Sequence, residues 1–128
     1  MASILRVDTI TDASSNNSIA TSIIYGGATR TWVTFDGTAS GATVGDSFNV
    51  SSSDDDGTGD YGINFTSNFN NANYSSTFGD GEGSATSGMR FLMDAGSTTS
   101  SQEIYGRNVS NSAADCAAAS LNCNGDPA

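Results

Sequence analysis

The most informative stretch of this 128-residue chain is residues 46–67, DSFNVSSSDDDGTGDYGINFTS. Apolar and polar residues alternate strictly in Ser47–Ser51 and again in Tyr61–Thr66. This period of two is typical of strands with one buried face. The segment between the two runs is rich in Ser, Asp and Gly, and its dipeptide Asp56-Gly57 is a strong hairpin-turn signal. Residues 46–67 therefore predict a β-hairpin with one apolar face.

Further strands are expected on both sides of this hairpin. Thr31–Phe35 alternates in the same way and is closed by the turn Asp36-Gly37. Shorter candidates, separated by Gly, Asn, Asp and Ser, lie at residues 74–78, 89–93, 104–109 and 118–123. This spacing predicts an all-β fold, a small antiparallel β-sandwich over residues 31–128. The expected core includes Trp32, Phe35, Phe48, Val50, Tyr61, Ile63 and Phe65.

The composition excludes several classes of protein. The chain has a net charge of −10, with 14 acidic residues, four arginines, no Lys and no His. A nucleic-acid-binding protein would present a basic face, which is not expected for this acidic chain. Zinc sites and His-based catalysis depend mainly on histidine, which the sequence does not contain. A serine nucleophile would lack a His or Lys base, so we expect no enzyme and no cofactor. No apolar run is long enough to cross a membrane, so no membrane insertion is expected.

The hydrophobic core is small for a chain of this length. Leu, Ile, Val and Phe number 21 of 128 residues, whereas each ordered residue costs about 1–2 kcal/mol of backbone entropy. Cys116 and Cys123 are too few for a disulfide framework and are expected to be free, buried thiols. A homo-oligomer would bury further apolar area and cover strand edges, so we expect one.

Residues 1–30 differ from the rest of the chain. Two short apolar runs flank a polar stretch, and Gly26-Gly27 ends the second run. The segment could be an edge strand and loop of the same domain, or an extended N-terminal arm that pairs with a partner chain. The arm is favoured because these apolar residues have no core of their own. The residues expected to make the attachment contacts are Ile4, Leu5, Val7, Ile10, Ile19, Ile23 and Ile24.

Several motifs resemble a module of tail-fibre and related virion proteins of marine and cyanobacterial bacteriophages. That module has the pattern W-V-x-F-N-G-T, x-S-F-N-V-S-S, D-N-G-T-G-D-Y-x-V-N-F-T and A-N-Y, after an L-K-V-D-T-I start. The similar segments of this chain are Ile4–Ile10 (ILRVDTI), Trp32–Thr38 (WVTFDGT), Asp46–Ser52 (DSFNVSS), Asp56–Thr66 (DGTGDYGINFT) and Asn73-Tyr74. The match is good over residues 3–12 and 30–75 and loose over residues 76–112.

The resemblance implies a homotrimeric phage structural protein of the virion, assembled in the host cytoplasm. Its arm would bind tail or baseplate proteins, and its β-rich outer domain would contact a glycan or protein of the host surface. A short tail fibre is the favoured role. A head decoration or cement protein and a free-standing carbohydrate-binding β module are the alternatives.

The hairpin loop is the expected site of host contact. The residues proposed for this contact are Asp54, Asp55, Asp56, Thr58 and Tyr74. Asp54, Asp56 and Asp60 are also spaced roughly as in a calcium loop, but Phe65 stands where the twelfth-position acid would be needed. A solvated acidic turn is therefore favoured over a calcium site, and no other metal site is expected. Trp32 could stack on a sugar, but its place in an alternating strand favours packing in the core.

Overall fold

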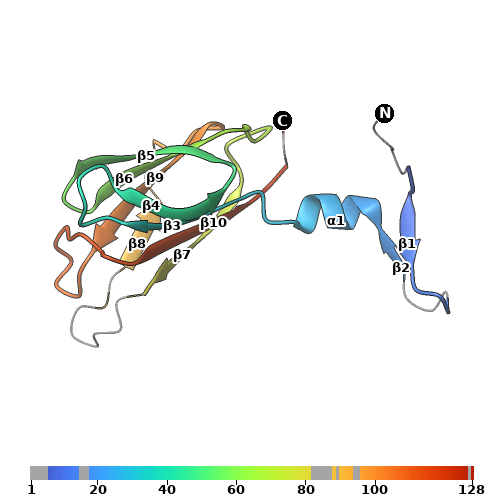
Figure 1. Ribbon diagram of the computed structural model, residues 1–128, viewed down its shortest axis with the longest axis horizontal. Helices are drawn as coiled ribbons and strands as arrows, with labels where there is room; N and C mark the ends of the chain where they lie inside the picture. Colours follow the sequence, from blue (N-terminus) through green and yellow to red (C-terminus); the bar gives the residue numbers. More distant parts are fainter. Residues whose placement is uncertain (1–5, 15–17, 82–87, 89, 94–95, 127) are drawn as a thin grey trace.

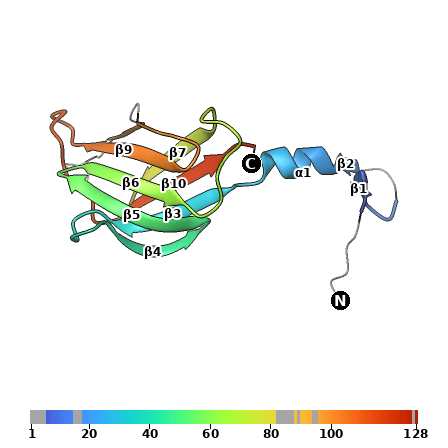
Figure 2. The same cartoon turned by 90° about the horizontal axis from the view of Figure 1, so that it is seen from above.

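The computed structural model describes residues 6–14, 18–81, 88, 90–93, 96–126 and 128. From residue 31 onward, these residues form two four-stranded antiparallel sheets that share one core (Figures 1 and 2). The first sheet contains, in spatial order, β4 (Thr43–Phe48), β3 (Thr31–Asp36), β10 (Ala119–Asn124) and β7 (Ser75–Asp80). The second sheet contains β5 (Val50–Gly57), β6 (Asp60–Phe65), β9 (Ser101–Arg107) and β8 (Arg90–Met93). The predicted all-β sandwich is confirmed.

The core lies between the two sheets and follows the predicted period of two. The buried apolar residues of the four central strands are Val33, Phe35, Tyr61, Ile63, Phe65, Ile104, Ala119, Leu121 and Cys123. The rings of Phe35 and Tyr61 meet edge to face across the sheets, with centroids 5.3 Å apart. The predicted core positions Phe35, Tyr61, Ile63 and Phe65 are confirmed, because each lies on the inward face of a central strand.

The prediction of a core position is wrong for Phe48, and Trp32 and Val50 are only half-buried. Phe48 is 56% exposed. Asn49 has a left-handed backbone (φ +61), so β4 ends at Phe48 and the chain crosses to the second sheet, where β5 begins at Val50. Phe48 pairs with Trp32 on the outer face of the first sheet, whereas Val50 packs against the core from the second. The alternation in residues 47–51 therefore spans two strands and not one.

The side chain of Asn49 holds this crossing in place. Its Oδ1 accepts the N–H of Ser67 at 2.7 Å. Its Nδ2 donates to the hydroxyl of Thr31 and to the carbonyl of Ser67, both at 3.0 Å. The backbone carbonyl of Asn49 accepts the N–H of Thr66, also at 3.0 Å. One residue thus joins the ends of β4 and β6 to the start of β3.

The predicted hairpin is formed by β5 and β6, but its turn is shorter than expected. Gly57 pairs with Asp60, so Thr58-Gly59 is a two-residue turn and residues 52–57 belong to the strand. Gly59 has φ +68, a conformation that favours glycine. The Asp56-Gly57 dipeptide predicted the hairpin correctly but placed its turn two residues too early.

Tyr74 is buried, so its predicted role in host contact is wrong. Its ring stacks on Phe69 with centroids 4.5 Å apart and meets Phe65 edge to face at 5.7 Å. Its hydroxyl donates to the carbonyl of Ser101 at 2.7 Å. The three rings close the end of the core at which β3 begins. An aromatic residue among Asn and Ser is buried here because the loop before β7 folds back over the sandwich.

Both cysteines are free and buried, as the sequence predicted. Cys123 lies on β10, with its Sγ 3.4 Å from the hydroxyl of Ser76. Burial raises the pKa of the Cys123 thiol from its ordinary 9.0 to about 11. Burial likewise raises the pKa of Tyr74 from 10.0 to about 12. Both shifts arise because the charged form loses its hydration in the core.

We expect the protein to lose stability as the pH rises from 9 toward 12. In the unfolded chain the two groups lose their protons near their ordinary pKa values of 9.0 and 10.0, whereas the folded chain retains these protons. Their contribution is therefore fully present below pH 9 and is lost as the pH rises through the raised values. Thermal unfolding between pH 8 and pH 12 measures this loss. Cys123→Ala should raise the pH at which stability begins to fall, from near 9.0 toward the ordinary tyrosine pKa of 10.0. If this pH did not change, the thiol would make no contribution.

The segment before β3 forms a short hairpin and a helix outside the sandwich (Figures 1 and 2). The strands β1 (Thr9–Thr11) and β2 (Ser18–Ala20) pair antiparallel, and α1 (Thr21–Gly27) follows directly. The N–H and hydroxyl of Thr21 both donate to the carbonyl of Asp8, at 3.0 and 3.1 Å. The sequence did not predict this helix, because seven residues are too few for a clear apolar stripe.

Candidate functional site

The turns of the sandwich divide into two groups at opposite ends of the molecule. Antiparallel pairing brings loops 37–42, 58–59 and 108–118 together at one end, which we call the distal end. The helix α1 and the start of β3 lie at the other end (Figure 1). Any surface formed by the distal loops therefore faces away from the N-terminal segment.

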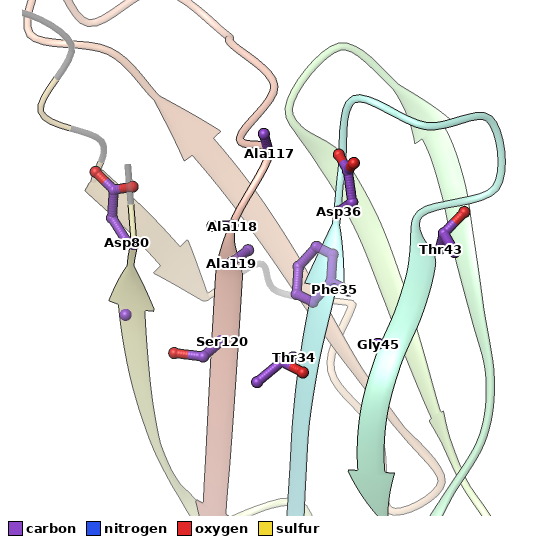
Figure 3. A pocket seen from close by; sticks show the side chains of 12 residues that line it. Thr34, Phe35, Asp36, Thr43, Gly45, Asp80, Ala117, Ala118, Ala119 and Ser120 are labelled. Atoms are coloured by element: carbon purple, nitrogen blue, oxygen red, sulfur yellow. The ribbon is translucent and has the colours of Figure 1, made fainter. Parts of the chain in front are cut away.

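A hollow of about 540 Å³ lies on the outer face of the first sheet at the distal end (Figure 3). This volume falls within the range of small-ligand sites. Figure 3 shows Asp36 and Asp80 on opposite sides of the hollow, with Ala119 and Ser120 of β10 between them. The lining residues are Thr34, Phe35, Asp36, Thr43, Gly45, Gly79, Asp80, Gly81, Ala117, Ala118, Ala119 and Ser120.

The hollow exists because small residues occupy outward positions of β7 and β10 and the positions next to their ends. Ser120 pairs with Gly79, and a Cβ at Gly79 would collide with the Ser120 hydroxyl. A Cβ at Gly81 would lie 3.0 Å from the Cβ of Ala118. These strands are far apart in the sequence, so local pattern could not predict the hollow. The strand register alone brings their small residues together.

The rim of the hollow carries two hydrogen-bond acceptors. The Asp36 carboxylate accepts the N–H of Thr38 at 2.9 Å and its hydroxyl at 2.6 Å. These bonds, the hydroxyl first, lower the pKa of Asp36 below its ordinary value. The Asp80 carboxylate accepts the thiol of Cys116 at 3.4 Å. Carboxylates around a largely apolar floor suit a ligand that donates hydroxyl hydrogen bonds, such as a neutral sugar.

The acidic residues of the hairpin lie on the surface near the distal end. Asp54, Asp55, Asp56 and Thr58 are exposed and Asp60 is half-buried. Asp54 accepts a hydrogen bond from the amide of Asn64 at 2.6 Å, and Asp55 accepts the N–H of Gly57 at 3.2 Å. No cluster of three His, Cys, Asp or Glu side chains suited to a metal ion occurs within the described ranges. The calcium interpretation of Asp54, Asp56 and Asp60 therefore finds no assembled ligand set there.

Asp115, which no sequence motif marked, connects the hairpin turn to the last loop. Its carboxylate accepts the N–H of Gly59 at 2.7 Å and lies 3.2 Å from the Tyr61 hydroxyl. The same hydroxyl accepts the N–H of Cys116 at 3.3 Å. Burial is the main cause that raises the pKa of Tyr61 well above its usual range. These bonds hold the distal loops in one arrangement.

The N-terminal segment exposes apolar side chains. Those of Val7, Ile10, Ile19, Ile23 and Ile24 are 42%, 50%, 38%, 61% and 42% exposed. Five of the seven predicted attachment residues thus have apolar surface available for a partner. The other two, Ile4 and Leu5, lie outside the described residues.

No family model matches this chain, and no curated protein or solved structure matches it significantly. In the part of the chain that the structure describes, no helix is both long and apolar enough to span a membrane. The fold defines an antiparallel β-sandwich with a hollow at its distal end.

Proposed function

We propose that this chain is a structural protein of a bacteriophage virion, most simply a short trimeric tail fibre. Residues 1–30 would join three copies to one another and to tail or baseplate proteins. The distal end would face a glycan or protein of the host surface. The observation that carries the proposal is the separation of two surfaces: exposed apolar side chains at the N-terminal end and the hollow with its acidic rim at the opposite end.

The exposed apolar side chains support association through the N-terminal segment. Burying one Val or Ile side chain is worth about 1.5–3 kcal/mol. Five such side chains lie outside the sandwich: four on two three-residue strands and a seven-residue helix, and Val7 just before β1. Structures this short are marginal in isolation, and a partner that covers them would stabilise them.

Host contact through the distal end would depend on repetition. A hollow with two rim carboxylates offers a neutral sugar a few hydrogen bonds over a small apolar floor, which supports only weak binding by one copy. Three copies per fibre, and several fibres per particle, would convert weak contacts into firm attachment. The hairpin residues Asp54, Asp55, Asp56 and Thr58 remain part of this proposed contact surface, because all four are exposed.

The hollow also fits a free-standing carbohydrate-binding module, which is the second candidate. That module would need no partner for the N-terminal segment and would be a monomer. The oligomeric state therefore separates the two candidates.

Deletion of residues 1–27 tests the proposal, since it removes β1, β2 and α1 but leaves every strand of the sandwich. We expect the full chain to have three times the monomer mass by light scattering, and the deletion to be a monomer. Both should have the same β-type circular dichroism. A monomeric full chain would overturn the fibre proposal in favour of the free module. A trimeric deletion variant would show that the N-terminal segment is not the interface. Ile23→Ser with Ile24→Ser, at two exposed positions, should weaken association without this large deletion.

A further inference from the structure

Two of the four arginines lie directly opposite each other at the distal end. Arg90 is the first residue of β8, Arg107 is the last of β9, and the two are register partners. Like charges in this position repel each other and destabilise a strand pair. The chain has 14 acidic residues and four arginines, and two of these four arginines face each other. The pairing of two arginines therefore needs a physical reason.

Both guanidinium groups converge on one residue of the next turn. Arg90 Nη2 donates to the side-chain oxygen of Asn111 at 2.8 Å, and Arg107 Nη1 donates to its carbonyl at 3.3 Å. Asn111 has a left-handed backbone, with φ +62. The carboxamide oxygen of Asn108 accepts the N–H groups of Ser110 and Ser112, both at 3.0 Å. The turn is thus braced, and it holds the two charges close together.

Tyr105 adds a ring beside the charges. It lies two residues before Arg107 on the same outward face of β9, and its ring centroid is 5.9 Å from the Arg107 guanidinium carbon. This distance is within the range of a cation–π contact. Two guanidinium forks beside a partly exposed aromatic ring match the two parts of an acidic sugar. The forks bind a carboxylate or phosphate group, and the ring packs against the apolar face of the pyranose.

We propose that Arg90, Arg107, Asn111 and Tyr105 form a binding site for a sugar that carries one carboxylate or phosphate group. The anion would offset the repulsion between the two arginines, which explains why they are paired. The net charge of −10 repels extended polyanions, so the site suits a single acidic unit in an otherwise neutral glycan. The site lies on the second sheet, whereas the hollow lies on the first. The inference does not depend on a role in a virion, since it concerns the surface of the purified chain.

The test is an NMR titration of the full chain, read from the backbone amides of Tyr105, Arg107 and residues 108–112. The probes are glucuronic acid, glucose 6-phosphate, glucose and inorganic phosphate. We expect shifts with at least one of the two acidic sugars and none with glucose. A preference between these sugars identifies the anionic group. Absence of shifts with both acidic sugars would overturn the proposal, and equally tight binding of inorganic phosphate would overturn the assignment to a sugar.

Substitutions test the two arginines separately from the fold. Arg90→Gln and Arg107→Gln should each weaken the binding of the acidic sugar about tenfold, which is the effect of losing one charge-assisted contact. Arg6→Gln makes the same change in net charge on the N-terminal segment and should leave the affinity unchanged. The amide spectrum of the remaining sandwich shows whether each variant is folded. Wild-type affinity in a folded Arg90→Gln, Arg107→Gln double variant would overturn the proposal without any bearing on the virion role.

Discussion

Replacing Gly59 with alanine is expected to lower the free energy of unfolding by about 3–4 kcal/mol. Gly59 has φ +68, where an alanine Cβ is strained. That Cβ would collide with the carbonyl oxygen of Gly106 and lie 2.8 and 2.9 Å from the O and N of Ala114. All three are backbone atoms, which cannot rotate away as a side chain can. The N–H of Gly59 donates to Asp115 and its carbonyl accepts the N–H of Gly106 at 2.7 Å, so a shift of the turn would break these bonds as well.

Gly41→Ala is the matched control for this prediction. Gly41 has φ +83, so an alanine there has similar backbone strain, but its Cβ would contact nothing within 4 Å. The expected loss at Gly41 is about 1 kcal/mol. Urea unfolding, followed by circular dichroism and by the emission of the single Trp32, measures both variants. Equal losses would mean that the contacts with Gly106 and Ala114 do not limit the turn.

The alternation of apolar residues predicted the centre of the core because it is a local property of a strand. Tyr61, Ile63 and Phe65 lie on one uninterrupted strand, so their period of two places all three on the buried face. The same rule failed at Phe48, because it assumes that successive residues stay in one strand. The left-handed backbone at Asn49 breaks that assumption. Asn tolerates this conformation better than most residues, and this was the local signal that could have predicted the break.

The candidate sites could not be predicted from local sequence, because they depend on strand register. The hollow places Gly79 of β7 beside Ser120 of β10, two residues far apart in the chain. The arginine site depends on the pairing of β8 with β9 and on the turn that contains Asn111. Tyr74 is buried for a comparable reason, since its partners Phe65 and Phe69 reach it only in the folded sandwich.

Asn49→Ala is expected to lower the free energy of unfolding by about 3 kcal/mol. The substitution removes the three hydrogen bonds that the side chain makes with Thr31 and Ser67. It also places alanine at φ +61, which costs more for alanine than for asparagine. Thr31 is fully buried, so its hydroxyl would lose a donor without access to water in exchange. The effect is large because the crossing between the two sheets depends on this one residue.

Two further variants identify the source of this loss. Asn49→Asp retains the tolerance for a left-handed backbone and the acceptor for the Ser67 N–H. It can donate neither to the Thr31 hydroxyl nor to the Ser67 carbonyl, so a loss of about 1–2 kcal/mol is expected. Asn122→Ala removes an exposed asparagine from β10, beside Trp32, and should change stability by no more than about 0.5 kcal/mol. The emission of Trp32 reports on the crossing directly, because its register partner Phe48 is the residue before Asn49. If Asn49→Ala lost no more stability than Asn122→Ala and left this emission unchanged, the crossing would be held by the packing of Val50 and Phe65 and not by the asparagine.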